Sequence, residues 1–518
     1  MRLSDLLAGV PHRWLRGPAS GAEPDVTLVT HDSRKAGPGA VFAALRGLKD
    51  DGLRFAPDAL ARGAAVLVVA AGRATAVQMG GWDRVVEVDD DRIALAVLSR
   101  RLHGSPDEAL TMVGVTGTNG KTTTCRLIAA VLEAAGVHTG LLGTVGHRMG
   151  DGSFVPAERT TPEASDLHAL LARMRDTGCG ACVMEVSSHA LDLGRVHGIG
   201  FDVAVFTNLT RDHLDYHKDM ESYFEVKQRL LDGLEAGAAA AINADDPYGR
   251  RLMQRLSARA GGPKVVSWGE ASDASVRLAS LKTGPRGSRL DLREAGASFV
   301  LDTPLAGRPN ASNVMAAAAA ARALGIGWDA VTRGVAAVQG VDGRMERVVA
   351  GTADQAGPGF EVYVDYAHTD DALRGLLETV RPITAGRVIL VFGCGGDRDR
   401  TKRPLMGAHA ARLADVVHVT SDNPRTEPPQ AIVDEILAGA DAVPQAERRP
   451  GLRLEADVDR SRAIHAAIAE ARPGDTVVIA GKGHETTQIL GSRVIPFDDR
   501  ELAREALRRR MEGSSHGA

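Results

Sequence analysis

The chain contains the stretch Gly114-Val-Thr-Gly-Thr-Asn-Gly-Lys-Thr-Thr123, which decides the fold class of its central part. The apolar run at residues 110–115 predicts a buried strand that leads into it. Residues 121–135 carry apolar side chains at helical spacing, and Gly136 ends the predicted helix. A strand, a glycine-rich turn and a helix N-terminus in this order present backbone N–H groups to phosphates. The stretch therefore predicts a nucleotide-binding α/β domain.

Two side chains of this phosphate loop have predicted roles. Lys121 would reach the terminal phosphates, and the Thr122 hydroxyl would ligate Mg²⁺. The spacing departs from the plain Walker pattern, because position 115 is Val and the nearest upstream glycine is Gly114. A chance Gly-Lys-Thr after a strand is the alternative, but the strand and helix around it favour nucleotide binding.

The 518 residues exceed what one hydrophobic core holds, so several domains are expected. Gly, Pro and charge together predict a linker at residues 103–108, and a second junction lies near residues 334–343. Apolar runs alternate with helical patterns on both sides of that junction, which indicates parallel sheets covered by helices. We expect an α/β protein of three domains: a smaller N-terminal α/β domain (1–105), a central phosphate-loop domain with a mostly parallel sheet (106–338) and a Rossmann-like C-terminal domain (339–518). The polar tail from Arg508 is expected to be loose.

Composition excludes several classes of protein. A formal net charge of −4 without a basic run gives no support for nucleic-acid binding. The N-terminus lacks an apolar signal segment, and no stretch reaches the ~18 apolar residues of a membrane span, so a cytoplasmic protein without membrane insertion is expected. Cys179 and Cys182 form a lone CxxC with no second pair, so metal or redox use of them is not favoured.

Polar clusters follow the predicted central strands, at the edge where open α/β sheets bind ligands. Glu185 lies within the apolar run 181–186, and a carboxylate there costs free energy unless it is paired or metal-bound. His213 follows the run 203–206. Glu185 and His213 are therefore predicted Mg²⁺ contacts, directly or through water. A capped loop is the alternative for any one cluster.

The predicted C-terminal strands end in similar clusters. Arg398 and Arg425 could each fork onto a carboxylate, and Glu485 could hold an ammonium group. These residues predict a pocket for a zwitterionic or multiply carboxylated molecule. Surface salt bridges on loops are the alternative.

Three longer motifs carry a resemblance to a known family: Met184-Glu-Val-Ser-Ser-His189, Asp212-His-Leu-Asp215 and Gly481-Lys-Gly-His-Glu485. With Asp32-Ser-Arg34 near the start, the chain resembles the Mur ligases over nearly its whole length. The phosphate loop alone marks only the wider superfamily, which includes folylpolyglutamate synthetases. The resemblance implies an ATP-dependent ligase that adds an amino acid to a UDP-linked muramyl dipeptide through an acyl phosphate.

The resemblance also implies site residues, with Lys121, His213 and Lys227 as the catalytic ones. The implied ATP contacts are Gly117, Thr118, Asn119, Gly120, Lys121, Thr122, Thr123, Asn310, Arg344, Asp365 and His368. The implied contacts to the UDP-linked dipeptide are Ser33, Leu48, Lys49, Asp50, Arg159, Thr160, Thr161, Ser187 and Arg195. Two Mg²⁺ ions would be held by Thr122, Glu185, His213 and a carbamylated Lys227.

Lys227 has this role only through the resemblance, because the sequence alone predicts a lysine on a helix surface. CO₂ adds to a neutral amine and converts a cation into an extra carboxylate that can hold a metal. An unmodified lysine, with a pKa near ~10.4, would instead repel the ion.

The implied amino-acid substrate is meso-diaminopimelate. Members of the family that add it carry Asp-Asn-Pro-Arg, which stands here at residues 422–425, whereas lysine-adding members usually lack the arginine. The implied contacts are Arg398, Asp422, Asn423, Pro424, Arg425, Gly481 and Glu485. An arginine fits the distal carboxylate that diaminopimelate has and lysine lacks, and a site built for that group discriminates strongly.

Alternative functions are a lysine-adding or folate-type ligase, a nucleotide switch or motor, and a non-catalytic UDP-sugar binder. The residues at 422–425 argue against a lysine-adding ligase, and the Asp32-Ser-Arg34 motif argues against a folate-type ligase. The missing guanine motif argues against a switch or motor, and the presence of Lys121 argues against a non-catalytic binder. We expect a monomer that acts on small molecules. Two positions depart from the family pattern and flank nucleotide contacts: Asp370 and Pro309.

Overall fold

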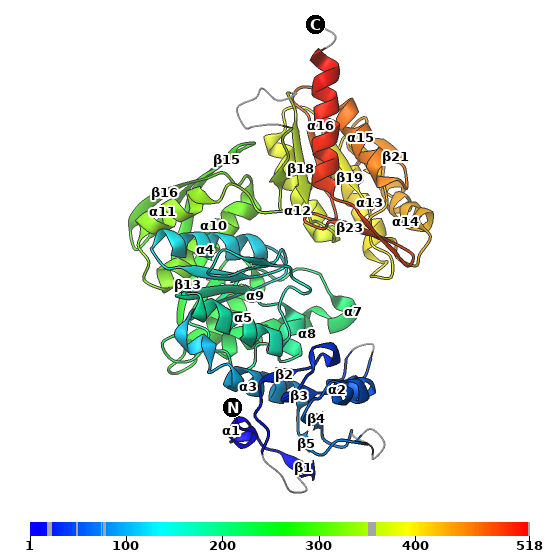
Figure 1. Cartoon of the computed structure of the whole chain (residues 1–518). Helices are drawn as coiled ribbons and strands as arrows, with labels where there is room; N and C mark the ends of the chain where they lie inside the picture. Colours follow the sequence, from blue (N-terminus) through cyan, green and yellow to red (C-terminus); the bar gives the residue numbers. More distant parts are fainter. Residues whose placement is uncertain (18–22, 48–49, 74, 76–78, 351–358, 516–518) are drawn as a thin grey trace.

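The computed structural model describes residues 1–17, 23–47, 50–73, 75, 79–350 and 359–515. It contains three large sheets, of five, eleven and six strands, that follow one another along the chain. Figure 1 shows them as three α/β parts stacked in chain order, with the central part between the other two. The predicted three-domain α/β fold is confirmed. Within the described residues, no helix is long and apolar enough to cross a bilayer.

The N-terminal sheet has the order β1-β5-β4-β3-β2, parallel except at β1. Its strands are β1 (Arg13–Arg16), β2 (Leu28–Thr30), β3 (Ala40–Ala43), β4 (Val66–Ala70) and β5 (Val85–Val88). Helices α1 (Leu3–Leu7) and α3 (Asp91–Leu102) pack on one face, and α2 (Ala56–Ala61) packs on the other. Helix α3 also contacts α5 (Ala164–Asp176) of the central part, which joins the two parts.

The central sheet has a parallel middle, β14-β13-β12-β11-β6-β10-β7, and antiparallel strands at both ends. The parallel strands are β6 (Thr111–Thr116), β7 (Thr139–Leu142), β10 (Ala181–Glu185), β11 (Val203–Phe206), β12 (Ala239–Asn243), β13 (Lys264–Gly269) and β14 (Val276–Gly284). The antiparallel additions are β8 (His147–Arg148), β9 (Phe154–Val155), β15 (Gly287–Glu294) and β16 (Ala297–Thr303). The prediction of a mostly parallel sheet is confirmed, and the antiparallel strands at its two ends were not predicted.

Two separate cores cover the faces of this sheet. Val113 and Val115 of β6 face α4 (Lys121–Ala134), α10 (Arg308–Ala323) and α11 (Trp328–Ala337). Met112 faces the opposite core, with α5, α8 (Met220–Asp232) and α9 (Pro247–Ser257). Because both faces are covered, the strands are continuous apolar runs, which is why the sequence revealed them. The short helices α6 (Ser188–Asp192) and α7 (Leu214–His217) follow β10 and β11.

The C-terminal sheet has the order β17-β18-β22-β19-β20-β21. Its strands are β17 (Glu346–Arg347), β18 (Glu361–Asp365), β19 (Val388–Phe392), β20 (Val416–Val419), β21 (Arg453–Ala456) and β22 (Thr476–Ala480). One face carries α12 (Asp370–Val380), α13 (Lys402–Leu413) and α14 (Pro429–Asp441), and the other carries α15 (Arg460–Glu470) and α16 (Asp499–Ser515). The prediction of a loose tail from Arg508 is wrong as far as Ser515, because α16 continues to that residue. The residues that pack this helix against the core, Ala503, Ala506 and Leu507, precede Arg508.

Candidate active site

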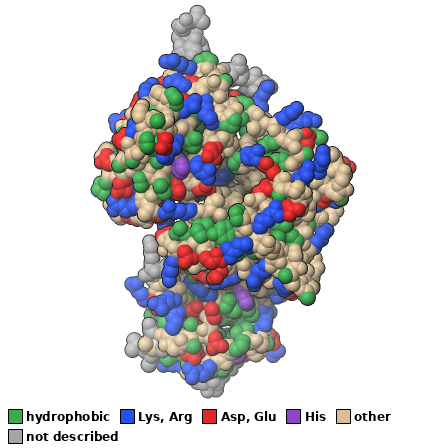
Figure 2. All heavy atoms as spheres, turned by 180° about the vertical axis from the view of Figure 1, so that it is seen from behind, with side chains coloured by type: hydrophobic (Ala, Val, Ile, Leu, Met, Phe, Trp, Pro, Cys, Tyr) green, Lys and Arg blue, Asp and Glu red, His purple; other side chains and the backbone are tan. Residues whose placement is uncertain are grey.

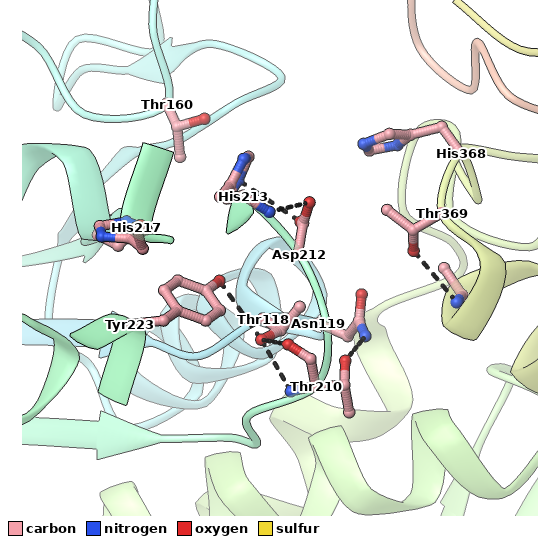
Figure 3. Close-up of polar contacts among 12 residues, drawn as sticks. Thr118, Asn119, Thr160, Thr210, Asp212, His213, His217, Tyr223, His368 and Thr369 are labelled. Atoms are coloured by element: carbon pink, nitrogen blue, oxygen red, sulfur yellow. Dashed lines mark hydrogen bonds and ion pairs between the residues drawn. The ribbon is translucent and has the colours of Figure 1, made fainter. Parts of the chain in front are cut away.

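A cavity of about 530 Å³ lies between the central and C-terminal parts. Its walls include Thr118–Thr123 of the phosphate loop and, from more distant segments, Asn310, Arg344, Asp365 and His368. In Figure 3, His368 and Thr369 face Asp212 and Asn119 from the opposite side. Figure 2 shows acidic and basic side chains around the hollow between these parts. The structure thus brings together all the predicted ATP contacts except Gly117, which lies in the loop just outside the lining.

The phosphate loop begins where β6 ends and stops where α4 starts. Gly117 and Gly120 have φ of 142° and 85°, and a Cβ at these positions would collide with Thr207 Oγ1 and Asn313 Oδ1. Lys121 Nζ donates to the carbonyls of Gly117 and Thr118, both at 2.9 Å, so its side chain lies over its own loop. Burial lowers the pKa of Lys121.

Glu185, at the end of β10, is 1% exposed and is fully hydrogen-bonded. Its Oε1 accepts from Thr122 Oγ1 at 3.0 Å and from Thr144 N at 2.8 Å, and its Oε2 accepts from Thr144 Oγ1 at 3.1 Å. These donors and the nearby Lys121 charge compensate the buried carboxylate. Two of the four predicted metal contacts, Thr122 and Glu185, therefore touch each other.

Lys227 is buried, and the sequence-only prediction of a surface lysine is wrong. It lies on α8, is 1% exposed and donates from Nζ to Gly117 O at 2.8 Å. The Tyr223 ring lies 4.6 Å from the same nitrogen. Burial and then the charge of Lys121 lower the pKa of Lys227 well below its ordinary value. This environment favours the neutral amine at the edge of the phosphate loop.

His213 lies on the loop after β11, with φ of 53°. Its Nε2 is 3.5 Å from Asp212 Oδ2, and its ring meets that of His189 edge-on, 5.1 Å between centroids. Burial lowers the pKa of His213 to about 4, so the imidazole is neutral near pH 7. Asp212, which the sequence prediction did not select, lines this cavity and a second one.

Four predicted dipeptide contacts form one connected group beside Glu185. Thr160 Oγ1 lies within hydrogen-bonding distance of Thr144 Oγ1, at 3.0 Å, and Thr161 Oγ1 donates to the Glu185 carbonyl at 2.9 Å. The Ser187 amide donates to Thr161 Oγ1 at 3.1 Å, and Arg195 Nη1 donates to Thr161 O at 3.1 Å. Arg195 is 8% exposed, and its buried Nε has no acceptor among the residues that the structure describes.

Glu163 orients Arg195 and was missed by the sequence prediction. Its Oε1 lies 2.7 Å from Arg195 Nη2, and its Oε2 lies 3.7 Å from Arg92 Nη1 of helix α3. The glutamate is 6% exposed and lies directly before α5. The ion pair therefore joins the connected group to the N-terminal part.

The other predicted dipeptide contacts lie apart from this group. Ser33 is buried at the start of a short 3₁₀ turn, and Asp50 is exposed and paired with Arg54 at 2.8 Å. Arg159 is exposed on the loop before Thr160. Leu48 and Lys49 lie outside the described residues.

A second cavity, of about 430 Å³, adjoins Asp212 and His213. The predicted amino-acid contacts in its lining are Arg398, Asp422, Asn423, Arg425, Gly481 and Glu485. Pro424 lies between two of these residues in the chain and outside the lining.

The acidic and basic groups of this cavity are held by neighbours. Arg425 Nη1 donates to Gly396 O at 2.7 Å. Glu485 Oε2 accepts from Asn423 Nδ2 at 2.9 Å and from the fully buried Lys482 Nζ at 3.0 Å. Lys482, another residue that the sequence prediction missed, thus compensates the carboxylate.

The two departures from the family pattern lie at helix starts. Pro309 is in the first turn of α10 and lines the first cavity, and Asp370 is in the first turn of α12 and lines the second. Proline is well tolerated at such a position, and an acidic residue there favours the helix dipole. Both residues are therefore compatible with α10, which carries Asn310, and with α12, which begins two residues after His368.

Three family models match the chain in order: "Mur ligase family, catalytic domain" at residues 25–102, "Mur ligase middle domain" at 115–321 and "Mur ligase, glutamate ligase domain" at 343–483. The chain is 46% identical to the UDP-N-acetylmuramoyl-L-alanyl-D-glutamate–2,6-diaminopimelate ligase of Solibacter usitatus, over 94% of each chain. It is 47% identical to the enzyme of that name from Gloeobacter violaceus, over 98% of this chain and 99% of the other. A solved structure of a ligase of the same name has a TM-score of 0.65 at 32% identity, covering 95% of this chain and 96% of the other.

Proposed function

The chain belongs to the Mur ligase family, and from this premise we propose that it adds meso-diaminopimelate to UDP-N-acetylmuramoyl-L-alanyl-D-glutamate in peptidoglycan precursor synthesis. Enzymes of this family use ATP. The observation that carries the proposal is the meeting of two cavities at Asp212 and His213. One cavity contains a phosphate loop, and the other contains guanidinium and carboxylate groups suited to a zwitterion with an additional carboxylate.

In this proposal ATP occupies the first cavity. Residues 117–123 bind its phosphates through their amides, through Lys121 Nζ and through the threonine hydroxyls. Asn310, Arg344, Asp365 and His368 contact the nucleoside. The supporting geometry is the position of these four side chains around the loop, from two different parts of the chain.

The residues at the loop suit Mg²⁺. Thr122 and Glu185 offer oxygen ligands 3.0 Å apart, and His213 offers a neutral ring nitrogen. We propose that CO₂ bonds to Lys227 Nζ with loss of a proton, since its lowered pKa favours the neutral amine that this step requires. The resulting carbamate would add a further negatively charged oxygen ligand. With it, the site would hold two Mg²⁺ ions. Bound Mg²⁺ would supply positive charge that offsets the phosphate oxygens.

The UDP-linked dipeptide is assigned to the path from the N-terminal part to Glu185. Ser33, Leu48, Lys49 and Asp50 would hold the UDP group, and Arg159, Thr160, Thr161, Ser187 and Arg195 would hold the muramyl dipeptide. The buried Arg195 Nε supports this role, because a buried donor without an acceptor is costly unless a ligand satisfies it.

The chemistry has two steps. The D-glutamate γ-carboxylate attacks the γ-phosphorus of ATP, which gives an acyl phosphate and releases ADP. Lys121 offsets the charge on the phosphate oxygens during this step. The neutral amine of diaminopimelate then attacks the acyl carbon, loses a proton, and expels phosphate. The protein positions the two substrates on either side of Asp212 and His213 and excludes water from the acyl phosphate.

The second cavity is assigned to diaminopimelate. The distal carboxylate of diaminopimelate would bind to the arginines, and Glu485 would hold an ammonium group. The proposed contacts are Arg398, Arg425, Asp422, Asn423, Pro424, Gly481 and Glu485. We also propose that residues 1–105, 106–338 and 339–518 are the three functional units and that the chain acts as a monomer.

The test is product analysis. The purified chain, with ATP, Mg²⁺, UDP-N-acetylmuramoyl-L-alanyl-D-glutamate and meso-diaminopimelate, should yield one ADP and one phosphate per new UDP-linked product. The mass of that product should exceed the dipeptide by one diaminopimelyl residue. ATP hydrolysis without a new amide product would contradict the proposal.

A further inference from the structure

A two-stranded hairpin follows Glu485 and lies outside the six-stranded C-terminal sheet. Its strands, β23 (Thr487–Leu490) and β24 (Arg493–Pro496), pair antiparallel. Most of β24 is exposed, with Val494 at 62%. Figure 1 shows the hairpin in red, between β22 and α16 in the chain. An isolated hairpin is marginally stable, so its contacts to the rest of the domain hold it in place.

The hairpin is hydrogen-bonded to the loop at residues 422–425. Gln488 Nε2 donates to Asp422 O at 2.7 Å, and the Ile489 amide donates to Asn423 Oδ1 at 3.0 Å. The Arg425 amide donates to Ile489 O at 3.1 Å, and the Gly491 amide donates to Arg425 O at 2.7 Å. Four hydrogen bonds from three residues of the hairpin, Gln488, Ile489 and Gly491, thus tie it to the loop that carries Arg425.

The backbone of Arg425 needs such support. Its φ is 53°, in the left-handed region that a residue with a side chain rarely adopts. Such a conformation persists where the surrounding structure imposes it. Arg425 is therefore held at both ends: the hairpin binds its backbone, and its guanidinium Nη1 donates to Gly396 O of the loop after β19 at 2.7 Å.

Gln488 is the side chain that makes this support specific. It is 5% exposed, and its amide reaches a main-chain carbonyl at the start of the loop. The other three bonds involve main-chain groups of the hairpin. Replacing Gln488 with leucine leaves the side-chain volume similar and removes the donor from a buried carbonyl, which has a cost in free energy.

We propose that Gln488 is a positioning residue for amino-acid selection: through the hairpin it fixes the loop at 422–425, and so the place of the Arg425 guanidinium. This inference rests on the proposed function. Gln488 lies outside the lining of the second cavity and acts only through the loop.

The test compares Gln488→Leu with the wild-type chain and with Gln430→Leu, a matched change on the exposed surface of α14. We expect KM for meso-diaminopimelate to rise about tenfold in Gln488→Leu, the effect of losing one hydrogen bond of ordinary strength. KM for ATP and for the UDP-linked dipeptide should stay within about twofold. Turnover of L-lysine, which has no distal carboxylate, should not change.

A double variant separates positioning from a general loss of structure. In an Arg425→Ala background, Gln488→Leu should cause no further loss of meso-diaminopimelate turnover, because the group it positions is gone. A further tenfold loss there, an equal rise of all three KM values, or an unchanged KM for meso-diaminopimelate would each overturn the inference.

Amide hydrogen exchange gives a readout that does not depend on turnover. In the chain without substrates, residues 421–427 should exchange faster in Gln488→Leu than in the wild type and in Gln430→Leu, while the phosphate loop should not change. Unchanged exchange at 421–427 would refute the bracing. If the wild type failed to use meso-diaminopimelate, the proposed function would fall, and the exchange measurement would still decide whether Gln488 braces the loop.

Discussion

His168 provides a test of how the buried interior of this chain responds to pH. It lies on α5, is 0% exposed, and neither ring nitrogen has a hydrogen-bond partner within the described residues. Burial lowers its pKa from 6.5 to about 4, with smaller effects of Asp107 and Arg100. The folded chain therefore holds a neutral imidazole at this position.

The sign and size of the effect follow from that pKa. The unfolded chain takes up this proton near pH 6.5 and the folded chain near pH 4. The contribution of His168 to the free energy of unfolding is therefore complete above pH 6.5 and is lost as the pH falls toward 4. At ~1.4 kcal/mol per pKa unit, the loss is about 2 kcal/mol at pH 5 and about 3 kcal/mol below pH 4.

The assay is urea unfolding of the wild type, of His168→Leu and of the exposed control His197→Leu at pH 8, 6.5 and 5. His213, His217 and His484, whose pKa burial also lowers to about 4, remain in all three proteins and cancel in the differences. Between pH 8 and 5, His168→Leu should gain about 2 kcal/mol relative to the wild type, and His197→Leu should not. A difference between His168→Leu and wild type that does not vary with pH would refute the reasoning.

Three further predictions concern other buried ionisable groups. Lys227→Met should lower kcat by about 10²–10³ without lowering the melting temperature, because a buried amine is replaced by an apolar chain; CO₂-depleted buffer should slow the wild type reversibly, and retained activity in the variant would count against a carbamate. Glu163→Gln should raise KM for the UDP-linked dipeptide about tenfold, because Arg195 is misplaced, and should leave KM for ATP unchanged. Equal changes in the two KM values would argue against this role of Glu163. Asp499→Asn should lower the free energy of unfolding in urea by about 3–5 kcal/mol, because Arg460 lies 2.6 Å away and both side chains are 0% exposed. The double variant Arg460→Met with Asp499→Leu should recover most of that loss.

The strands of the two larger sheets were predictable because they are buried on both faces. The apolar run predicted at 203–206 matches β11 to the residue, and β19 and β22 are similarly apolar in the printed sequence. Such runs need no knowledge of the partner strand. Strands β15 and β16 alternate buried and exposed side chains among polar residues, and nothing in that local pattern states that they extend the central sheet.

Lys227 marks the limit of sequence reasoning about the site. Helical spacing places Lys227 on the same face of α8 as the buried Tyr223, Phe224, Leu230 and Leu231, which the prediction of a surface lysine overlooked. Only the fold shows that its amine reaches Gly117 O of the phosphate loop. Glu163, Lys482 and Gln488 were missed for the same reason. Each acts on a residue that is distant in sequence or in another loop, and a motif records the residue types without the contacts between them.

The positions of Lys121, Glu185 and Arg425 were easier to predict, because each lies at or just after the carboxyl end of a parallel strand: β6 and β10 in the central sheet, and β20 in the C-terminal sheet. That topology predicts which side chains converge, and the two cavities contain them. Topology does not predict how far burial shifts a pKa, and burial lowers the pKa of Lys227 well below its ordinary value and that of His213 to about 4.

The most direct test of the central claim is ATP-dependent phosphate release with UDP-N-acetylmuramoyl-L-alanyl-D-glutamate, with meso-diaminopimelate and L-lysine supplied in parallel. The account predicts turnover with diaminopimelate, little with lysine, and loss of that preference in Arg425→Ala. Turnover with lysine equal to that with diaminopimelate would contradict the assigned role of Arg425, and phosphate release that needs neither amine would contradict the ligase reaction itself.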